Sequence, residues 1–209
     1  PRNAPGGPLG RDEDLLGLRG SPTTQLLFDE ARIPADHRLG EEGEGFKIAM
    51  VCLDEARLNC AAMALGVAQA ALEVAVSYAK ERVQFGKPII QHQGLQFLLA
   101  DSTARLAAAR SLWEQAMTLV ETRRDRRAST FAAMAKLVAT EAAMQITTDA
   151  VQALGGSGLS RDFPVERMMR DVKAFQIFDG TSQIQKMLIG RYLEKFGVPF
   201  ADGAQTGAA

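Results

Sequence analysis

Long runs of helical periodicity constrain the fold of this chain more than any other feature of its sequence. From position 45 to position 154, apolar residues recur at intervals of three and four, and two short breaks rich in Gly, Pro or Arg interrupt them. This spacing predicts a first helix over residues 45–80, a second over 92–122 and a third over 129–154. Ser129 is expected to cap the third helix, because its hydroxyl can accept a hydrogen bond from a free backbone N–H there.

Two shorter helical segments follow the long ones. One is expected after Pro164, and a last helix from about Thr181 carries apolar residues at positions 184, 188, 192 and 196. The glycine run at 155–158 closes the third helix, since glycine readily takes the backbone conformation that ends helices. Three long helices and a shorter fourth, joined by short breaks, predict an all-α fold that is an up-and-down four-helix bundle.

The segment before the helices has a different composition. Residues 1–20 are rich in Gly and Pro and are predicted to be irregular, whereas residues 23–28 are expected to form one strand. A single strand is not stable alone, so it either pairs with something absent from this chain or stays loosely attached. We therefore divide the chain into a short irregular and β segment, residues 1–42, and a bundle, residues 43–209.

Composition excludes several classes of protein. The chain has 46% hydrophobic and 23% charged residues and a net charge of −1, so it has no general attraction for nucleic acid or for anionic membranes. No window of about twenty apolar residues is free of charge, so no membrane-spanning helix is expected. Cys52 and Cys60 would lie about 12 Å apart on one helix, too far for a disulfide. His37 and His92 are too isolated to suggest a metal site.

Residue 1 is Pro rather than Met, and no apolar signal-peptide core follows it. We therefore expect the chain to be a piece of a longer protein.

Four clusters carry candidate chemistry but also have ordinary explanations. Asp54 and Arg57 share one helix face, as a surface ion pair would. The segment 82–93 resembles any loop between two helices, and the basic run 123–127 resembles a solvated connection. The glycine-rich stretch 152–158 could bind phosphate if it opened a helix, but here it closes one.

A fifth cluster is more specific, because it places Asp179 among apolar residues just before a helix. The neighbouring Phe175, Ile177 and Phe178 should partly desolvate this carboxylate, which favours its neutral form and suits a general base. The amino end of the following helix favours the charged form instead. The sequence does not decide between these two effects.

Taken together, the order and spacing of these clusters resemble the acyl-CoA dehydrogenase family over residues 15–196. The matching stretches are 43–47, 53–57, 82–87, 91–93, 149–156, 170–171 and 178–185. The resemblance implies the C-terminal helical domain of a tetrameric flavoenzyme, preceded by the tail of its central β-domain. It also implies a reaction in which a carboxylate removes a proton next to the thioester of an acyl-CoA and a hydride passes to FAD. The product would be a trans-2-enoyl-CoA, and the electrons would pass to an electron-transfer flavoprotein.

The resemblance further implies roles for individual residues, with Asp179 at the position of the family's catalytic base. The expected contacts to the flavin nucleotide are Gly180, Thr181 and Gln183. The expected contacts to the FAD of a neighbouring subunit are Arg82, Gln84, Phe85 and Gln93, with Gln152, Leu154, Gly155 and Gly156 beside them. The expected substrate contacts are Asp54 and Arg57 near the CoA portion, and Arg127 and Ser129 near its nucleotide phosphates, which suit a guanidinium.

Two departures from the family pattern concern the base. The family usually has Glu where this chain has Asp179, and a carboxylate drawn back by about 1 Å can lower the rate about a hundredfold. Some relatives place the base on the first long helix, at the position held here by Ala56. Its neighbour Glu55 would point about 100° away on a helix, which disfavours Glu55 as a substitute.

Three hypotheses about function follow. The first is an FAD-dependent acyl-CoA dehydrogenase that uses Asp179, acts as a homo-oligomer (a dimer or tetramer) and lies in the cytoplasm, or in the mitochondrial matrix of a eukaryote. The second is a nitroalkane-oxidase-like flavoenzyme, which uses an Asp base with oxygen as acceptor. The third is a non-catalytic partner subunit that lends Arg82 and Gln93 to the FAD of a working subunit.

Overall fold

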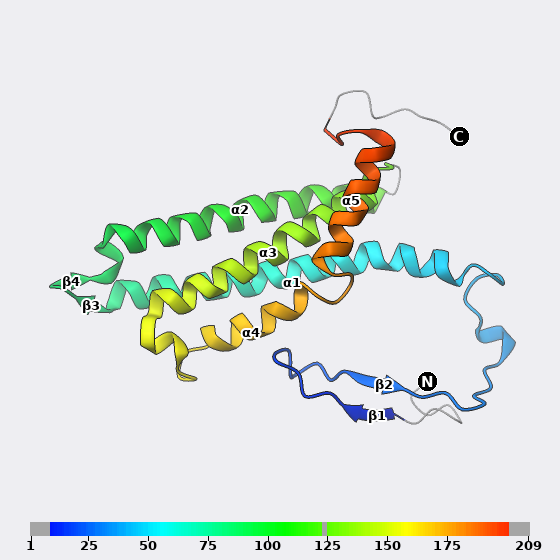
Figure 1. Ribbon diagram of the computed structural model, residues 1–209, viewed down its shortest axis with the longest axis horizontal. Coiled ribbons are helices and arrows are strands. Elements are labelled where there is room, and N and C mark those ends of the chain that lie inside the picture. The colour runs from blue at the N-terminus through cyan, green and yellow to red at the C-terminus, as the bar shows by residue number, and fades with distance from the viewer. Residues whose placement is uncertain (1–8, 123–124, 201–209) are drawn as a thin grey trace.

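The computed structural model describes residues 9–122 and 125–200, most of which form helices. Three long helices lie side by side along the longest axis of the molecule (Figure 1). They are α1 (Gly45–Glu81), α2 (Gln93–Thr122) and α3 (Ala128–Leu154). The shorter α4 (Val165–Phe175) packs on α3 and α1, and α5 (Ser182–Phe196) crosses α3. The predicted all-α bundle is confirmed, and the long helices begin and end within one residue of their predicted bounds.

Small side chains let α1 and α3 approach each other closely. Fully buried alanines on α1 include Ala64, Ala68, Ala71 and Ala75, and those on α3 include Ala132, Ala135, Ala139 and Ala143. Larger buried side chains, such as those of Leu58, Phe131 and Ile146, fill the remaining space. By length and composition alone α1 could also cross a membrane. This is weak evidence, because its alanine-rich face forms part of the bundle core.

The predicted N-cap role of Ser129 is wrong. The N-cap position of α3 is Arg127, so Ser129 lies within the first turn of the helix. The Arg127 side chain makes no capping hydrogen bond, and Asp125 instead closes the turn before the helix, because its Oδ1 accepts a hydrogen bond from the backbone N–H of Arg127 at 2.8 Å. The Ser129 hydroxyl is thereby free to donate to Asp54 on α1.

The prediction of irregular structure over residues 1–20 is wrong for residues 9–12, and its first part, residues 1–8, lies outside the described residues. Strand β2 (Thr24–Leu26) pairs with β1 (Leu9–Asp12), a stretch that the sequence indicated to be irregular. The two strands are antiparallel, and the Thr24 hydroxyl donates to the carbonyl of Gly10 at 2.7 Å. The strand expected over residues 23–28 therefore pairs with a strand of the same chain. The sequence pattern did not predict this pairing, because it depends on backbone groups rather than on apolar side chains.

The N-terminal segment is also joined to the bundle. The backbone N–H of Leu18 donates to Asp171 Oδ1 at 2.7 Å, and Arg170 Nη1 donates to the carbonyl of Leu16 at 2.9 Å. Gly17 is buried so close to α4 that a Cβ there would lie 2.4 Å from the carbonyl oxygen of Arg170. This segment is therefore not loosely attached to the described part of the chain.

Short elements complete the described structure. Strands β3 (Val83–Gln84) and β4 (Lys87–Pro88) form a hairpin between α1 and α2. The 3-10 helices are η1 (Ala35–His37), η2 (Ile89–Gln91) and η3 (Gly155–Leu159). Gly155 ends α3 with a φ of 59°, which confirms that the glycine run closes this helix.

Candidate functional site

Asp179 lies at a sharp corner between α4 and α5. Its φ of 53° and the φ of 91° at Gly180 are both in the left-handed region, and together they turn the chain into the last helix. The φ at position 180 favours glycine, and a Cβ there would also lie 2.7 Å from Gln185 Nε2. Thr181 is the N-cap of α5 and its hydroxyl accepts from the N–H of Ile184. The corner thus presents a half-buried carboxylate at the start of a helix, as the sequence predicted.

Two buried polar side chains hold this corner, and neither was predicted. Lys136 on α3 donates from Nζ to the carbonyl of Gly180 at 2.7 Å, and Gln185 on α5 donates from Nε2 to the same carbonyl at 2.8 Å. Both side chains are completely buried. The sequence did give one signal for Lys136. It lies on the alanine-rich face of α3, which is expected to be buried, whereas lysines normally lie on exposed faces.

The electrostatics of the corner centre on this lysine. Burial lowers the pKa of Lys136, whereas the nearby Cys60, Asp179 and Glu141 raise it and Arg57 lowers it further. Burial raises the pKa of the Cys60 thiol to about 11, and Cys60 Sγ lies 3.6 Å from the carbonyl oxygen of Phe175. Asp179 and Arg57 therefore both lie within electrostatic reach of Lys136.

Asp54, Arg57 and Ser129 form one network across α1 and α3. Arg57 Nη1 donates to Asp54 Oδ1, and the Ser129 hydroxyl donates to the same oxygen at 2.9 Å. The side chains of Arg57 and Asp54 are only 7% and 25% exposed, so this is a buried pair rather than the surface pair that the bare pattern suggested. Arg57 Nε is buried with no hydrogen-bond partner among the described residues.

Arg127 lies close to this network but is already bound within the chain. Its Nε and Nη2 donate to the Asp125 carboxylate, with Nη2 at 2.6 Å from Oδ2, and its Nη1 donates to the carbonyl of Pro199. These hydrogen bonds lower the pKa of Asp125 and raise that of Arg127. A cavity of about 270 Å³ nearby is lined by Asp54, Ser129 and Asp125, among others. Arg126 rather than Arg127 lines this cavity.

The other predicted cofactor contacts lie at the far end of the bundle. Arg82, Gln84 and Gln93 are exposed on or beside the β3–β4 hairpin, and Phe85 at its tip is 92% exposed. The carboxyl end of α3 adds the exposed residues Gln152, Gly155 and Gly156. The Leu154 side chain is buried in the core, so only its backbone can face a ligand. A cavity of about 490 Å³ at this end includes Arg82, Tyr78 and Ser157.

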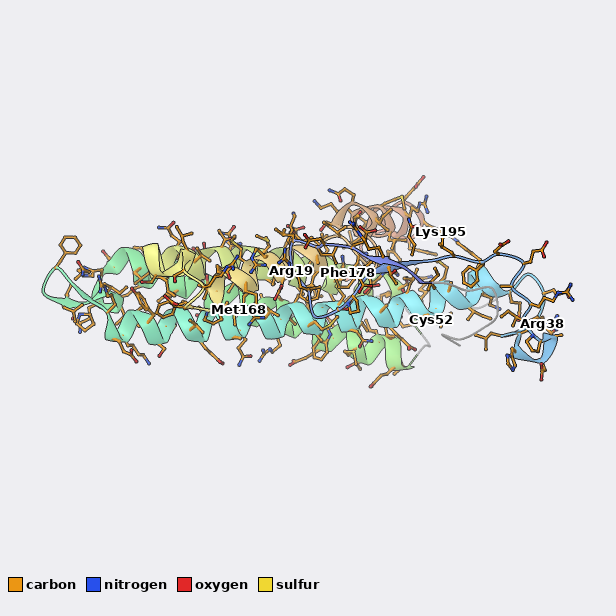
Figure 2. All side chains as sticks on the ribbon, turned by 90° about the horizontal axis from the view of Figure 1, so that it is seen from below. Arg19, Arg38, Cys52, Met168, Phe178 and Lys195 are labelled. Carbon is orange, nitrogen blue, oxygen red and sulfur yellow. The ribbon has the colours of Figure 1, made fainter. Side chains whose placement is uncertain are left out.

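The corner and the hairpin are far apart in one chain. Cys60 on α1 touches the carbonyl of Phe175 near the corner, and Arg82 follows it by 22 residues, which corresponds to about 33 Å along a helix. In Figure 2, Phe178 marks the corner, which lies well along the bundle from the hairpin end. A single bound molecule near Asp179 therefore does not also contact Phe85 of the same chain.

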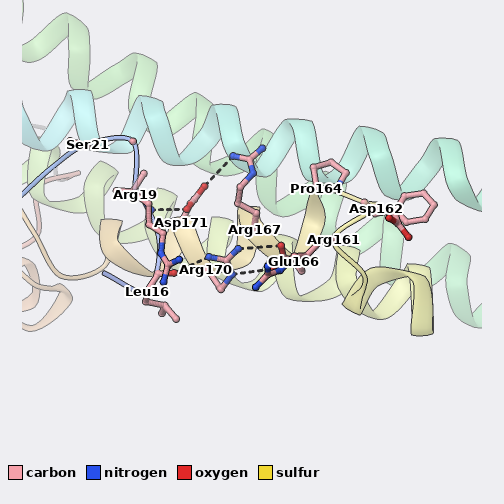
Figure 3. Close-up of a pocket in the computed structure, with 13 residues that line it drawn as sticks. Leu16, Arg19, Ser21, Arg161, Asp162, Pro164, Glu166, Arg167, Arg170 and Asp171 are labelled. Atoms are coloured by element: carbon pink, nitrogen blue, oxygen red, sulfur yellow. Dashed lines mark hydrogen bonds and ion pairs between the residues drawn. The ribbon is translucent and has the colours of Figure 1, made fainter. Parts of the chain in front are cut away.

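A larger cavity lies elsewhere in the described part of the chain. It has a volume of about 960 Å³ and is formed by residues 16–21 and the start of α4 (Figure 3). Four of its charged side chains are paired with one another. Arg170 binds Glu166, which lowers the pKa of Glu166, and Arg167 binds Asp171 at 3.3 Å. The cavity contains none of the predicted site residues, and its contacts join the N-terminal segment to α4.

The fold and the corner define an all-α bundle domain with a half-buried carboxylate at the start of its last helix. Comparison with known proteins identifies the family. The model of the acyl-CoA dehydrogenase C-terminal domain matches residues 43–194. An acyl-CoA dehydrogenase of Bacillus subtilis is 50% identical over 192 residues, which are 92% of this chain and 50% of that protein. The chain belongs to the acyl-CoA dehydrogenase family.

Solved structures agree with this assignment. The structure of butyryl-CoA dehydrogenase from Megasphaera elsdenii is similar with a TM-score of 0.89 and 46% identity, over 92% of this chain and 50% of that one. A structure described as the electron transferring flavoprotein of Acidaminococcus fermentans, concerned with flavin-based electron bifurcation, also has a TM-score of 0.89 and 46% identity. The match covers 91% of this chain and 50% of that chain. The chain thus spans about half the length of the proteins it matches.

Proposed function

We propose that this chain is the C-terminal part of an FAD-dependent acyl-CoA dehydrogenase that converts an acyl-CoA into a trans-2-enoyl-CoA. The observation that carries the proposal is the half-buried Asp179 at the corner before α5, where Lys136 and Gln185 both donate to the carbonyl of Gly180. Membership of the family supports the same reaction. The side chain removes a proton from the carbon next to the thioester carbonyl. When bound, FAD supplies the hydride acceptor.

The network of Asp54, Arg57 and Ser129 supports a binding site for the CoA portion of the substrate. An unpaired buried N–H such as Arg57 Nε carries a free-energy cost, which a bound acceptor group would remove. Asp54 and Ser129 also line a cavity at the end of this network. In this proposal Arg127 reaches the nucleotide phosphates by exchanging part of its pairing with Asp125 for a phosphate, which offers the same bidentate geometry.

The hairpin end fits the adenosine and phosphate part of FAD. Arg82, Gln84 and Gln93 offer exposed donors, and the exposed ring of Phe85 offers a stacking surface for adenine. Because this end lies about 33 Å from the level of the corner, we propose that it contacts the FAD held near Asp179 of another subunit. The protein then works as a homo-oligomer, either a dimer or a tetramer.

The remaining parts of the proposal concern the electron acceptor and the location. The similarity to the structure described as an electron transferring flavoprotein of Acidaminococcus fermentans supports an electron-transfer flavoprotein as the partner that reoxidises the flavin. We propose a cytoplasmic location, or the mitochondrial matrix if the source is eukaryotic.

The test follows the flavin of the full-length protein when butyryl-CoA is added without oxygen. We expect the flavin absorbance of the wild type to fall, and Asp179→Asn to slow this change at least about a hundredfold, because the amide cannot accept the proton. Asp101→Asn, at an exposed position on α2, serves as the matched control and should reduce at the wild-type rate. Reduction of Asp179→Asn at the wild-type rate would overturn the proposal.

The same assay separates the other two hypotheses. Reduction by nitroethane but not by butyryl-CoA would indicate a nitroalkane-oxidase-like enzyme. A chain that binds FAD only after mixing with a second subunit, and is reduced by neither compound, would be a non-catalytic partner.

A further inference from the structure

The proposed adenosine site at the hairpin end has two sides that are distant in sequence. Arg82 lies on one side, directly after α1, and the glycine loop (residues 155–158), which follows α3, forms the other. In Figure 1 the turn after α3 lies next to the end of α1. Because the two sides come from different helices, contacts between them set the distance that a bound cofactor meets.

Tyr78, in the last turn of α1, is bonded to both sides. Its backbone carbonyl accepts from the N–H of Arg82 at 2.9 Å, which fixes the backbone that carries the guanidinium. Its phenol oxygen lies 3.1 Å from the hydroxyl oxygen of Ser157 in the glycine loop, and either group can donate this hydrogen bond. One residue therefore connects Arg82 to the glycine loop.

Packing on both sides keeps this connection in place. The Tyr78 ring meets the ring of Phe163 edge to face, with 5.4 Å between the centroids, so the phenol has little freedom to turn away. At the other end of the glycine loop, Gly158 lies so close to α3 that a Cβ there would be 2.4 Å from the carbonyl oxygen of Val151. The loop is thus anchored on α3 by close packing and on α1 by the hydrogen bond to Tyr78.

The space beside this connection fits part of a cofactor. Tyr78, Ser157 and Arg82 all line the cavity of about 490 Å³ at this end. The backbone of Gly155 and Gly156 is open to a ligand, because a Cβ at either position would meet no described atom within 4 Å.

We propose that Tyr78 is a positioning residue for FAD. Through its hydrogen bond to Ser157, it holds the glycine loop at the distance from Arg82 that the adenosine and phosphate part of the cofactor requires. The inference rests on the proposed function, in which this end contacts the FAD of another subunit. It assigns a role to two side chains that the family pattern did not mark.

The experiment removes FAD from the full-length protein and measures the Kd of the apoprotein for FAD and for FMN by isothermal titration. FMN lacks the adenosine monophosphate part of FAD, so its Kd reports on the rest of the flavin site. We expect Tyr78→Phe and Ser157→Ala each to raise the Kd for FAD about fivefold, the effect of losing one hydrogen bond. The Kd for FMN should not change. The double variant should bind FAD as either single variant does, because both changes remove the same hydrogen bond.

Two further variants serve as controls. Tyr192→Phe removes a buried phenol hydroxyl on α5 that has no hydrogen-bond partner among the described residues, so it should leave both Kd values unchanged. Ser157→Thr keeps a hydroxyl and should bind FAD as the wild type does. The melting temperature reports whether each variant is folded, and each single variant tests the inference by itself should the other not fold.

Three results would overturn the inference. The first is a wild-type Kd for FAD in folded Tyr78→Phe or Ser157→Ala. The second is an equal rise of the Kd values for FAD and FMN, which a general loosening of the structure would cause. The third is a wild type that binds FAD no more tightly than FMN. Failure of the proposed reaction is distinct from these, because it would appear as a wild-type holoenzyme whose flavin butyryl-CoA does not reduce.

Discussion

Three ionic side chains in this chain lie in covered positions, although charged residues in a sequence usually indicate an exposed surface. Lys136 is buried completely, and Arg57 and Asp54 are mostly covered. Charged residues are almost never buried unless they are paired or functional. Among the described ionic side chains, Lys136 and Arg57 are buried the most, and both lie near the corner.

The two cysteines are expected to differ in reactivity. Cys60 is fully buried and burial raises the pKa of its thiol to about 11, whereas Cys52 is exposed. A thiol reagent such as dithiobisnitrobenzoate should modify Cys52 rapidly at pH 8 and Cys60 only after unfolding in guanidinium, because the thiolate is the reactive form. Cys52→Ser should show no rapid reaction. A rapid reaction of both thiols in the native wild type would contradict this expectation.

The same shift predicts how stability depends on pH. The folded-state pKa of Cys60 is raised from 9.0 to about 11, so the stabilisation from its neutral thiol is complete below pH 9 and is lost as the pH rises through 11. Urea unfolding should therefore show that the free energy of unfolding falls more between pH 8 and pH 10.5 in the wild type than in Cys60→Ala. An equal fall in the two proteins would contradict the raised pKa of Cys60.

At the scale of the elements, local sequence signals determine where the helices begin and end. Contacts between elements determine the turns and the strand pairing. The breaks at the β3–β4 hairpin and at Gly155 were visible as glycines and as interruptions of the apolar stripe. The turn that Asp125 closes before α3 and the pairing of β1 with β2 were not visible in the sequence. Both depend on which of several nearby polar groups reaches a free backbone N–H or C=O, and many residues can do this equally well.

Two glycines with open space around them should respond in opposite ways to alanine. Gly66 lies inside α1, so Gly66→Ala should raise the free energy of unfolding by about 0.5–1 kcal/mol. Gly155 has a φ of 59° in a region that side chains avoid, so Gly155→Ala should lower it by about 2 kcal/mol. Urea unfolding followed by circular dichroism measures both, and changes of the same sign would refute the account of how α3 ends.

At the scale of the whole molecule, the predicted cofactor contacts divide between two distant regions. The corner carries Gly180, Thr181 and Gln183, and the hairpin end carries Arg82, Gln84, Phe85 and Gln93, with about 33 Å of α1 between the two levels. In the proposed function, this separation means that one chain does not enclose a cofactor by itself. It also makes association of subunits part of the proposed site.

The 209-residue chain alone should bind FAD weakly, because it spans about half the length of the proteins it matches and would supply only part of a cofactor site. We expect isothermal titration to give a Kd well above about 1 µM. The full-length protein serves as the positive control. Binding with a submicromolar Kd by the chain alone would show that one group suffices.

The sequence by itself determined the helices, their bounds and the place of the candidate base. Apolar spacing and glycine preference are local properties, and Asp179 directly precedes a helix start that Thr181 marks. The tertiary structure alone decided that Lys136 is buried, that Asp54 and Arg57 form a covered pair, and that β1 finds β2. The physical reason is that burial and pairing depend on which face of an element meets another element. Residues far apart in the chain set that contact.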